Sequence, residues 1–493
     1  MKNLLQELKE SKNVRSNLSS LRQMVKEDAS RKEALTFFEE NGGLLESFLE
    51  QEDAKTRKNA ALLVGDLGMS ELAKVLYQGY KKETTLFVKA SYLQALALLD
   101  AEELLDDLKA DLLNLQQQEV TEENKKHVDE EMRALRAILI QYEGIDAHKV
   151  DYKGKQVTAL LICNRNLREN VKNMVTCGKA EVHPMGVLVE TDCLEELLTI
   201  RAFREVVFPL PKKGLIPGSP EDAAKAIWNA GIMDLLTGLH QGEGSFYYRI
   251  ECKNSMELEQ RSTFTKKLSA ALDRISKGAL VNSTGDYEVE IRLIANKEGN
   301  YFPCVKLYTL PDKRFTYRKN AIASSIHPST AALMMEVAEK YLKEDAQIMD
   351  PFCGVGTMLI ERHKKLAAKE IYGTDIFGDA IIGARENAQL AGVRVNYIHR
   401  DFMDFAHDYL FDEIITNMPI RGKKTKPEMD EFYGEFFKKA QEILKQNAIM
   451  ILYTNEMGFV KKYLRLHKEY QLLQEVVMQP KTDFNMVIIR YHK

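Results

Sequence analysis

The chain has 493 residues, of which 45% are hydrophobic and 29% are charged, and its formal net charge is -4. This length predicts about three domains. The net charge excludes the overall excess of basic residues that is typical of many nucleic-acid-binding proteins. No run of about 18 apolar residues occurs, and the N-terminus lacks the apolar stretch of a secretory signal. We therefore expect a cytoplasmic protein without a membrane span.

The cysteines argue against a metal centre. None of the six forms a C-x-x-C pair, so we expect no zinc site and no other bound metal. Such usage is typical of proteins in a reducing cytosol. The six are Cys163, Cys177, Cys193, Cys252, Cys304 and Cys353.

Residues 1–145 are predicted to be helical throughout, because their apolar residues recur at spacings of three and four. Residues 56–68 resemble residues 88–100, and the offset of 32 is a little short of the period of HEAT-type repeats. The pattern favours an all-α, HEAT-like domain over residues 1–145, with a simple helical bundle as the alternative. The acidic stretch at 101–131 is interpreted as a solvated face that should repel RNA. Two roles stay open for the domain as a whole, an extension of a nucleic-acid-binding surface and the recruitment of a protein partner.

Residues 150–320 are predicted to form an α+β region. We expect its first part at 150–240 and its second at 241–320. Strands are predicted at 156–162, 182–189, 245–252, 287–295 and 301–307, and helices at 220–239 and 258–276.

The second part of this region carries a local basic excess. Between Arg261 and Asn320 there are twelve Lys and Arg against six Asp and Glu, a difference of +6. Positive side chains bind phosphates and release counterions, so this excess favours a nucleic acid as partner.

From residue 321 onward, strands and helices alternate as in a doubly wound, Rossmann-like parallel sheet, so we expect a multidomain α/β protein. Ligands of such sheets bind at the carboxyl ends of the strands. Strands are predicted at 346–350, 370–374, 393–399, 413–416, 448–453, 472–478 and 485–491, and helices at 358–369, 379–390 and 428–445.

Polar motifs follow the first four of these strands. The turn after Asp350 is rich in glycine but is neither a P-loop nor G-x-G-x-x-G, which argues against ATP hydrolysis and NAD. Asp350 can accept a hydrogen bond from an ammonium group, Asp375 from ribose hydroxyls, and Asp401 from an adenine amino group. Together they predict a pocket for an adenosine that bears an amino-acid tail and no phosphate.

The fourth motif is Asn417-Met418-Pro419-Ile420. The Asn417 amide and the carbonyl before Pro419 can both accept hydrogen bonds from a substrate NH2 group. Two acceptors would aim the nitrogen lone pair at a methyl sulfonium, which is catalysis by positioning.

These motifs resemble those of the THUMP-domain RNA methyltransferases. DPFCGVGTMLIE (350–361) is similar to their first cofactor motif, TNMPIRG (416–422) to their N-P-P-Y/F type catalytic motif, and residues 325–332 to the segment that leads into the pocket. More loosely, segments of the middle region resemble a ferredoxin-like domain followed by a THUMP domain. The resemblance covers about 155–493 and does not reach residues 1–145.

This resemblance implies a class I methyltransferase domain at 321–493 that uses S-adenosyl-L-methionine. Members of the family methylate the exocyclic amino group of guanosine, so the implied substrate is tRNA, with rRNA as a possibility. The implied catalytic residues are Asn417, Met418, Pro419 and Ile420. The implied cofactor-binding residues are His327, Pro328, Asp350, Pro351, Phe352, Cys353, Gly354, Gly356, Thr357, Asp375, Ile376, Asp401, Phe402 and Asn417. The basic residues that we expect to bind RNA are Lys266, Lys267, Arg274, Lys277, Lys313, Arg314, Arg318, Lys319, Arg421 and Lys423.

One position departs from the family pattern. Ile420 stands where the family usually has Tyr or Phe, and an aromatic side chain there stacks on the flipped base, worth about 1–3 kcal/mol. Phe432 and Tyr433 are candidates to cover the base instead. Two other hypotheses stay open: methylation of another amine, such as adenine N6 in rRNA or DNA or a protein glutamine, and a catalytically weak RNA-binding or assembly protein.

Overall fold

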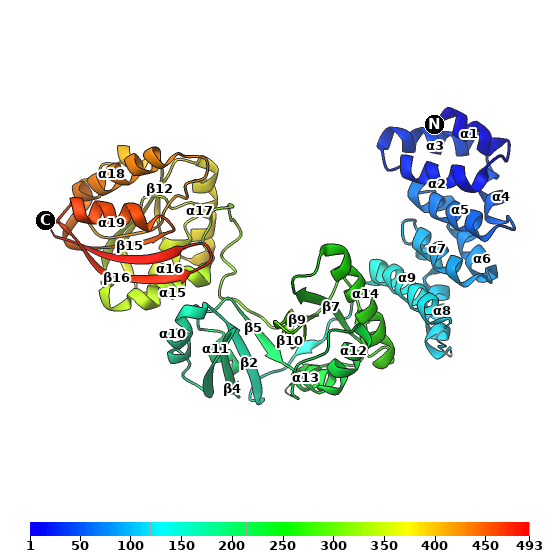
Figure 1. The fold of residues 1–493 in the computed structure, drawn as a ribbon, viewed down its shortest axis with the longest axis horizontal. Coiled ribbons are helices and arrows are strands. Elements are labelled where there is room, and N and C mark those ends of the chain that lie inside the picture. The colour runs from blue at the N-terminus through cyan, green and yellow to red at the C-terminus, as the bar shows by residue number, and fades with distance from the viewer. Residues whose placement is uncertain (119, 122, 213, 493) are drawn as a thin grey trace. The chain divides into compact units, whose positions relative to one another are not determined.

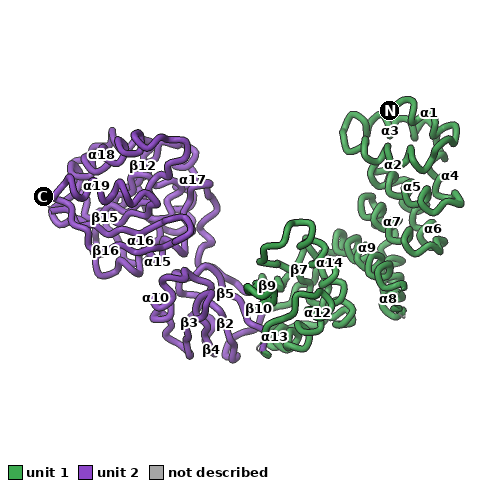
Figure 2. The backbone as a smooth tube through the Cα atoms, in the orientation of Figure 1, with its two compact units in different colours: residues 1–149, 212–303, 307–309 green, residues 150–211, 304–306, 310–493 purple. Residues whose placement is uncertain are grey.

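The computed structural model describes residues 1–493 except 119, 122, 213 and 493 (Figure 1). The chain divides into two compact units (Figure 2). Unit 1 comprises residues 1–149, 212–303 and 307–309, and unit 2 comprises residues 150–211, 304–306 and 310–493. Among the described residues, no helix is both long enough and apolar enough to cross a membrane.

The N-terminal part of unit 1 is helical, as predicted (Figure 1). Helices α4 and α5, α6 and α7, and α8 and α9 pack as successive pairs, and α2, α5, α7 and α9 pack on one another in that order. The helices are α1 (Lys2–Lys9), α2 (Val14–Met24), α3 (Asp28–Glu40), α4 (Leu44–Leu49), α5 (Ala54–Leu67), α6 (Ala73–Lys82), α7 (Leu86–Leu96), α8 (Leu105–Gln117) and α9 (Lys125–Glu143).

The two similar sequence segments occupy α5 and α7, which lie directly against each other. Their backbones approach closely at Gly65, where a Cβ atom would come within 2.8 Å of the Ala95 Cα. Gly79 of α6 allows a similar approach to the ring of Tyr92. Paired helices with small residues at their contacts agree with the predicted sequence repeat. The assignment of this repeat to the HEAT type stays a prediction.

The rest of unit 1 combines helices with a small sheet. Strand β7 pairs in parallel with both β8 and β9. The predicted helix at 220–239 is in fact two helices, because Gly231 has a φ of +85° and breaks it. The elements are α12 (Pro220–Asn229), α13 (Ile232–Leu239), β6 (His240–Gln241), β7 (Phe246–Lys253), α14 (Leu258–Ile275), β8 (Leu280–Asn282) and β9 (Val289–Ala295).

Buried ion pairs join the helical array to α14. The Arg136 Nη1 of α9 lies 2.9 Å from the Asp273 Oδ2 of α14, and their side chains are only 8% and 13% exposed. Asp273 also accepts a hydrogen bond of 2.9 Å from the Tyr248 hydroxyl. One residue further along α14, Arg274 pairs with Asp129 of α9. The array and the α14 module therefore share a polar interface inside unit 1.

The first part of unit 2 is an antiparallel sheet with the strand order β3-β4-β2-β5, and β5 continues onto residues 304–306 of β10. The strand predicted at 182–189 is wrong as a single element, because the chain reverses between His183 and Gly186. A Cβ atom at Gly186 would lie 1.9 Å from the Leu161 carbonyl oxygen, so only glycine fits this start of β4. The elements are β1 (Lys149–Val150), β2 (Val157–Ile162), α10 (Arg168–Asn173), β3 (Lys179–His183), β4 (Gly186–Thr191), α11 (Leu194–Leu197), β5 (Glu205–Pro209) and β10 (Tyr301–Leu307).

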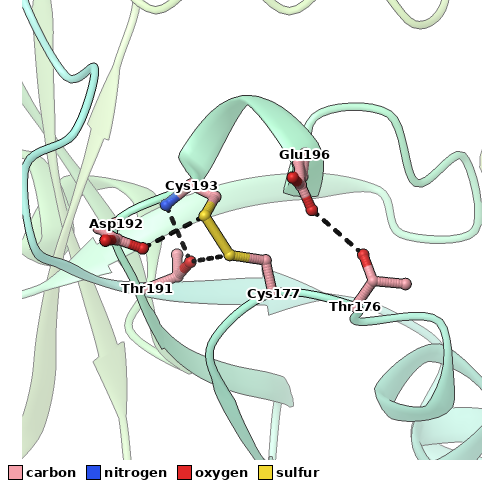
Figure 3. Close-up of a disulfide and its surroundings, with 6 residues drawn as sticks. All are labelled: Thr176, Cys177, Thr191, Asp192, Cys193 and Glu196. Atoms are coloured by element: carbon pink, nitrogen blue, oxygen red, sulfur yellow. Dashed lines mark hydrogen bonds between the residues drawn. A yellow bond between two sulfur atoms is a disulfide. The ribbon is translucent and has the colours of Figure 1, made fainter.

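A disulfide joins the two ends of this β3–β4 hairpin, between Cys177 and Cys193 (Figure 3). This disulfide was not predicted from the sequence, and disulfides are rare in a reducing cytosol. The Glu196 carboxylate lies near both sulfur atoms, and these three groups are the one possible metal cluster found among the described residues. Sulfur atoms bonded to each other are not thiolate ligands, so we assign no metal there.

The second part of unit 2 is a seven-stranded sheet with the order β13-β12-β11-β14-β15-β17-β16, in which only β17 runs antiparallel to its neighbours. This confirms the predicted Rossmann-like sheet. The strands are β11 (Ala346–Asp350), β12 (Ala368–Asp375), β13 (Asn396–His399), β14 (Phe411–Asn417), β15 (Leu444–Thr454), β16 (Tyr470–Gln479) and β17 (Phe484–Tyr491). The helices are α15 (Pro328–Ala338), α16 (Thr357–Lys365), α17 (Gly378–Ala391), α18 (Lys426–Ile443) and α19 (Met457–Leu466).

Both faces of this sheet are covered by helices (Figure 1). Successive residues of a strand point to opposite faces, and in β11 the side chain of Ile348 packs with α16 and α17 while that of Met349 packs with α18 and α19. The predicted helix at 358–369 ends early, because Ala368 and Lys369 already belong to β12. Helices α15 and α19 were not predicted.

A buried ion pair ties α16 to β14 on one side of the sheet. The Arg362 guanidinium is 0% exposed and the Glu413 carboxylate 1% exposed, and two hydrogen bonds of 2.7 and 2.9 Å join them. The same guanidinium also donates to the Lys343 carbonyl at 2.7 Å. Because α16 follows the glycine-rich turn and β14 leads to Asn417, this pair fixes two motifs relative to each other.

Candidate functional site

Unit 2 contains a cleft of about 1570 Å³ at the carboxyl ends of the parallel strands. In the strand order β11 has β12 on one side and β14 on the other, so the chain reverses direction across the sheet at β11 and β14. Open α/β sheets bind ligands at such a switch point. The predicted site residues that line the cleft are His327, Asp350, Pro351, Phe352, Cys353, Gly354, Thr357, Asp375, Ile376, Asp401, Phe402, Asn417, Met418, Pro419 and Ile420.

The turn after β11 passes close to the cleft through two glycines. Gly354 and Gly356 have φ values of +50° and +82°, which favour glycine. At Gly356 a Cβ atom would also lie 2.0 Å from the Tyr397 hydroxyl oxygen. Gly356 itself does not line the cleft, so its role is to shape the turn. The next residue, Thr357, begins α16, and its buried hydroxyl has no hydrogen-bond partner among the described residues.

The three predicted carboxylates lie at the ends of three adjacent strands. Asp350 ends β11, is 1% exposed and accepts a hydrogen bond of 3.0 Å from the Phe352 amide. Burial raises the pKa of Asp350 to about 7. Asp375 ends β12 and accepts a hydrogen bond of 2.8 Å from the Gly354 amide, which ties the glycine turn to β12. Asp401 follows β13 and is exposed, and it accepts from the Met403 amide at 3.0 Å.

Asn417 ends β14, next to β11. Its Nδ2 donates to the Ser324 carbonyl at 2.9 Å, which orients the side-chain amide and leaves Oδ1 as an acceptor. The Met418 amide donates to the Tyr453 carbonyl at 2.9 Å, which fixes the peptide between Asn417 and Met418. The Ile420 side chain is 53% exposed. One amide acceptor and one backbone carbonyl therefore stand beside the three carboxylates.

Several aromatic residues line the cleft around this motif. Phe432 and Phe484 both contribute, and the Phe484 ring stacks on that of Tyr453 with centroids 4.8 Å apart. Tyr433 does not, because it is fully buried and its hydroxyl forms a 2.7 Å hydrogen bond with Thr454. Of the two aromatic residues considered in place of Ile420, only Phe432 can reach a ligand.

The other predicted cofactor residue outside the cleft lining is Pro328. It is buried as the first residue of α15, behind His327, whose ring nitrogen accepts from the Ser329 amide at 3.2 Å. Burial lowers the pKa of His327 to about 4, so its ring is neutral near pH 7. Pro328 positions the cleft wall without forming part of its surface.

The predicted RNA-binding residues fall into two groups. Arg314 is buried, stacks on Phe203 and donates to Asp312 and to two backbone carbonyls, so the prediction that it binds RNA is wrong. Arg274 is engaged by Asp129 and by Glu221. Arg318 is partly buried. The side chains that remain exposed are Lys266, Lys267 and Lys277 in unit 1, and Lys313, Lys319, Arg421 and Lys423 in unit 2.

The structure also brings to the cleft three segments that sequence reasoning missed. Residues 162–166 at the end of β2 and residues 202 and 204 before β5 line it, as does the turn between β16 and β17. No motif marks these residues, and their placement depends on contacts between segments more than 300 residues apart, such as the 2.8 Å hydrogen bond from Asn164 Nδ2 to the Met478 carbonyl.

Comparison with known proteins finds similarity in the C-terminal part of the chain. The model of a family described as "RMKL-like, methyltransferase domain" matches residues 316–482. The tRNA (guanine(10)-N2)-dimethyltransferase of Methanothermobacter thermautotrophicus is 30% identical over 131 residues, which cover 26% of this chain and 38% of that protein. The tRNA (guanine(6)-N2)-methyltransferase of Archaeoglobus fulgidus is 27% identical over 159 residues, covering 27% of this chain and 40% of that protein. The chain thus spans less than half the length of either relative.

A solved structure extends the likeness of fold. TrmN from Thermus thermophilus superposes with a TM-score of 0.51 at 18% sequence identity, and the match covers 68% of this chain and 99% of that one. The family model covers only 167 of 493 residues (316–482), whereas the superposition with TrmN covers 68% of the chain. The similarity of fold to TrmN therefore extends beyond the seven-stranded sheet and its helices.

Proposed function

We propose that this protein is an S-adenosyl-L-methionine-dependent RNA methyltransferase that acts on the exocyclic N2 of a guanosine in tRNA. The observation that carries the proposal is the convergence of Asp350, Asp375, Asp401 and Asn417 on one cleft from four adjacent strands. The N2-guanine activities of the two archaeal relatives support the choice of base and of RNA.

The cleft fits the proposed cofactor. The partnerless hydroxyl of Thr357 and the N-terminal amides of α16 suit the carboxylate of its amino-acid tail, and the buried Asp350 suits its ammonium group. Asp375 would accept from the ribose hydroxyls and Asp401 from the adenine amino group. When bound, the cofactor supplies an electrophilic methyl group on a sulfonium.

The residues at the end of β14 would position the substrate. The Asn417 Oδ1 and the Met418 carbonyl accept the two hydrogens of the guanine amine, which aims its lone pair toward the cofactor half of the cleft. Pro419 restricts the backbone of Met418, and the hydrogen bond from the Met418 amide to Tyr453 fixes the preceding peptide. The proton released from the amine leaves to solvent. Phe432 or Phe484 stacks on the base in place of an aromatic residue at position 420.

The remaining parts of the molecule belong to the same proposal. We assign residues 150–240 and 241–320 to a ferredoxin-like part and a THUMP-like part that dock the RNA through phosphates. The exposed lysines of α14, Lys266 and Lys267, are the contacts that we expect from unit 1. The helical domain at 1–145 would contact a protein partner, and the protein would act in the cytoplasm.

Modified nucleosides give the direct test of this function. RNA from cells with and without the gene, digested and compared by mass spectrometry, should differ in N2-methylguanosine. Purified protein given labelled cofactor and bulk tRNA, rRNA or protein should label tRNA. A changed level of N6-methyladenosine, or label in protein alone, would replace the proposed substrate.

Cofactor affinity should depend on pH through Asp350. Because burial raises the pKa of this carboxyl to about 7, it is mostly protonated at pH 6 and mostly ionised at pH 8. The cofactor's ammonium favours the ionised form, so binding releases a proton below pH 7 and the affinity should rise with pH. We expect the Kd of S-adenosylhomocysteine to fall about tenfold from pH 6 to pH 8.

Isothermal titration calorimetry in two buffers of different ionisation enthalpy measures both the Kd and the proton release. The matched variant Asp350→Asn cannot titrate, so its affinity should be weaker and the slope with pH should flatten. An unchanged slope in this variant would assign the proton to another group.

A further inference from the structure

The carboxylates at the strand ends lie in one half of the cleft. Asp350, Asp375 and Asp401 lie at the ends of β11, β12 and β13, which form one half of the sheet, and Glu428, Glu431 and Glu435 of α18 line the cleft as well. Beyond Asn417 the other half begins, with Tyr453 of β15 and Phe484 of β17 as aromatic lining. Two arginines, Arg165 and Arg204, also line this cleft, and both are exposed.

Arg165 is held at the β16 edge of the cleft. It lies between Asn164 and Asn166, whose side-chain amides donate to the carbonyls of Met478 and Val477 at 2.8 Å each. Both acceptors belong to β16, at the end of the sheet order furthest from β13. The backbone on either side of Arg165 is therefore fixed to the half of the sheet opposite the cofactor carboxylates.

Arg204 comes from the neighbouring strand. Its amide donates to the Ile162 carbonyl at 2.7 Å, so it lies beside the end of β2, from which Arg165 also comes. Neither guanidinium has an ion pair or hydrogen bond with a side chain in the part of the chain that the structure describes. By contrast, nearby Arg201 forms an ion pair with Glu361, and Arg314 forms one with Asp312. Two free guanidinium groups at one cleft mouth form a site for an anion.

We propose that Arg165 and Arg204 bind the phosphates that flank the target nucleotide of the RNA, and so hold the strand while its base enters the cleft. This inference rests on the proposed function. A phosphodiester fits because guanidinium groups pair with phosphate in a bidentate manner, and because the free cofactor carries no phosphate to compete for the site. The two arginines lie at the ends of β2 and β5 of the small antiparallel sheet of unit 2, so that sheet would form one wall of the substrate site.

The inference is tested with Arg165→Gln, Arg204→Gln and the double variant of the full chain. The matched control is Lys172→Gln on α10, which removes the same charge from a half-buried side chain of the same part of unit 2 that does not line the cleft. We expect KM for tRNA to rise about five- to tenfold for each single variant and more in the double variant. The kcat at saturating tRNA and the Kd of S-adenosylhomocysteine should stay within about twofold of wild type.

Salt dependence and a conservative variant separate a phosphate contact from a structural role. The slope of log Kd for labelled tRNA against log salt should become shallower by about one unit for each arginine removed. Arg165→Lys keeps the positive charge but loses the bidentate geometry, so it should restore the wild-type salt slope and part of the affinity. A wild-type KM and salt slope in the double variant would overturn the inference, as would an equal loss of S-adenosylhomocysteine affinity or no rescue by lysine.

Failure of the proposed function has a different signature. If wild-type protein methylates no RNA, the function is wrong, whatever the arginines do. The measurement of tRNA binding still tests the role of the two arginines in that case, because binding requires no turnover. Equal tRNA Kd values and salt slopes for wild type and the double variant would refute that role.

Discussion

Replacing Asn417 by alanine is expected to lower kcat for RNA methylation by about 100-fold or more while cofactor affinity stays near wild type. The Asn417 amide ends β14 and stands beside the carboxylates of β11 and β12, with Oδ1 available to the substrate amine. Without it the amine loses one of its two acceptors, and misplacement of a reacting group by about 1 Å can cost about 100-fold in rate. Single-turnover transfer from labelled cofactor to tRNA measures the effect.

The matched control is Asn396→Ala, at the start of β13, which removes an amide that does not line the cleft. This control should transfer methyl groups at the wild-type rate. Calorimetry with S-adenosylhomocysteine checks that Asn417→Ala still forms the pocket. Methylation by Asn417→Ala at the wild-type rate would remove Asn417 from the mechanism and leave the alignment of the amine to other groups.

Replacing Arg362 by methionine should destabilise the seven-stranded sheet by about 3–5 kcal/mol. The change leaves the fully buried Glu413 carboxylate without its cation, and it removes the donor to the Lys343 carbonyl. The free energy of opening of the β14 amides, measured by hydrogen exchange, reports this loss locally. Because β14 ends at Asn417, cofactor binding should weaken as well.

Two further variants distinguish the effect of leaving a buried charge without its partner from the effect of simply removing a charged side chain. Lys461→Met breaks the Lys461–Glu475 pair, whose side chains are 50% and 30% exposed, and should cost less than about 1 kcal/mol. The double variant Arg362→Met with Glu413→Leu removes both charges and should recover much of the stability lost in the single variant. Equal losses in the single and double variants would mean that packing, rather than the uncompensated carboxylate, is responsible.

The sheet and its polar strand ends could be predicted because their signals are local. The strand at 346–350 agrees with β11 residue for residue, and Asp350 follows from its place at that strand's end. An apolar run bounded by a glycine-rich turn contains all the information needed for such an element. The His183–Gly186 reversal was missed because Val182 before the turn and Val187, Leu188 and Val189 after it resemble one continuous strand.

What could not be predicted depends on distant contacts. Arg314 contributes to a basic segment in sequence, yet it is buried by carbonyls of residues 200 and 203, more than 100 positions away. Arg165 has no motif around it, and it reaches the cleft only because its neighbours bind β16. Net charge counted along a chain does not distinguish a guanidinium facing solvent from one enclosed by the fold.

The pair between Arg136 of α9 and Asp273 of α14 determines how the N-terminal array can be studied genetically. Ending a deletion at residue 145 would take Arg136 away and leave Asp273 buried without its cation, although burial already raises the pKa of that carboxyl to about 6. Such a truncated protein would carry a defect of its own, independent of any lost partner. Surface substitutions on α1 to α8 leave α9 intact, so they can test the binding of a protein partner without destabilising the contact between α9 and α14.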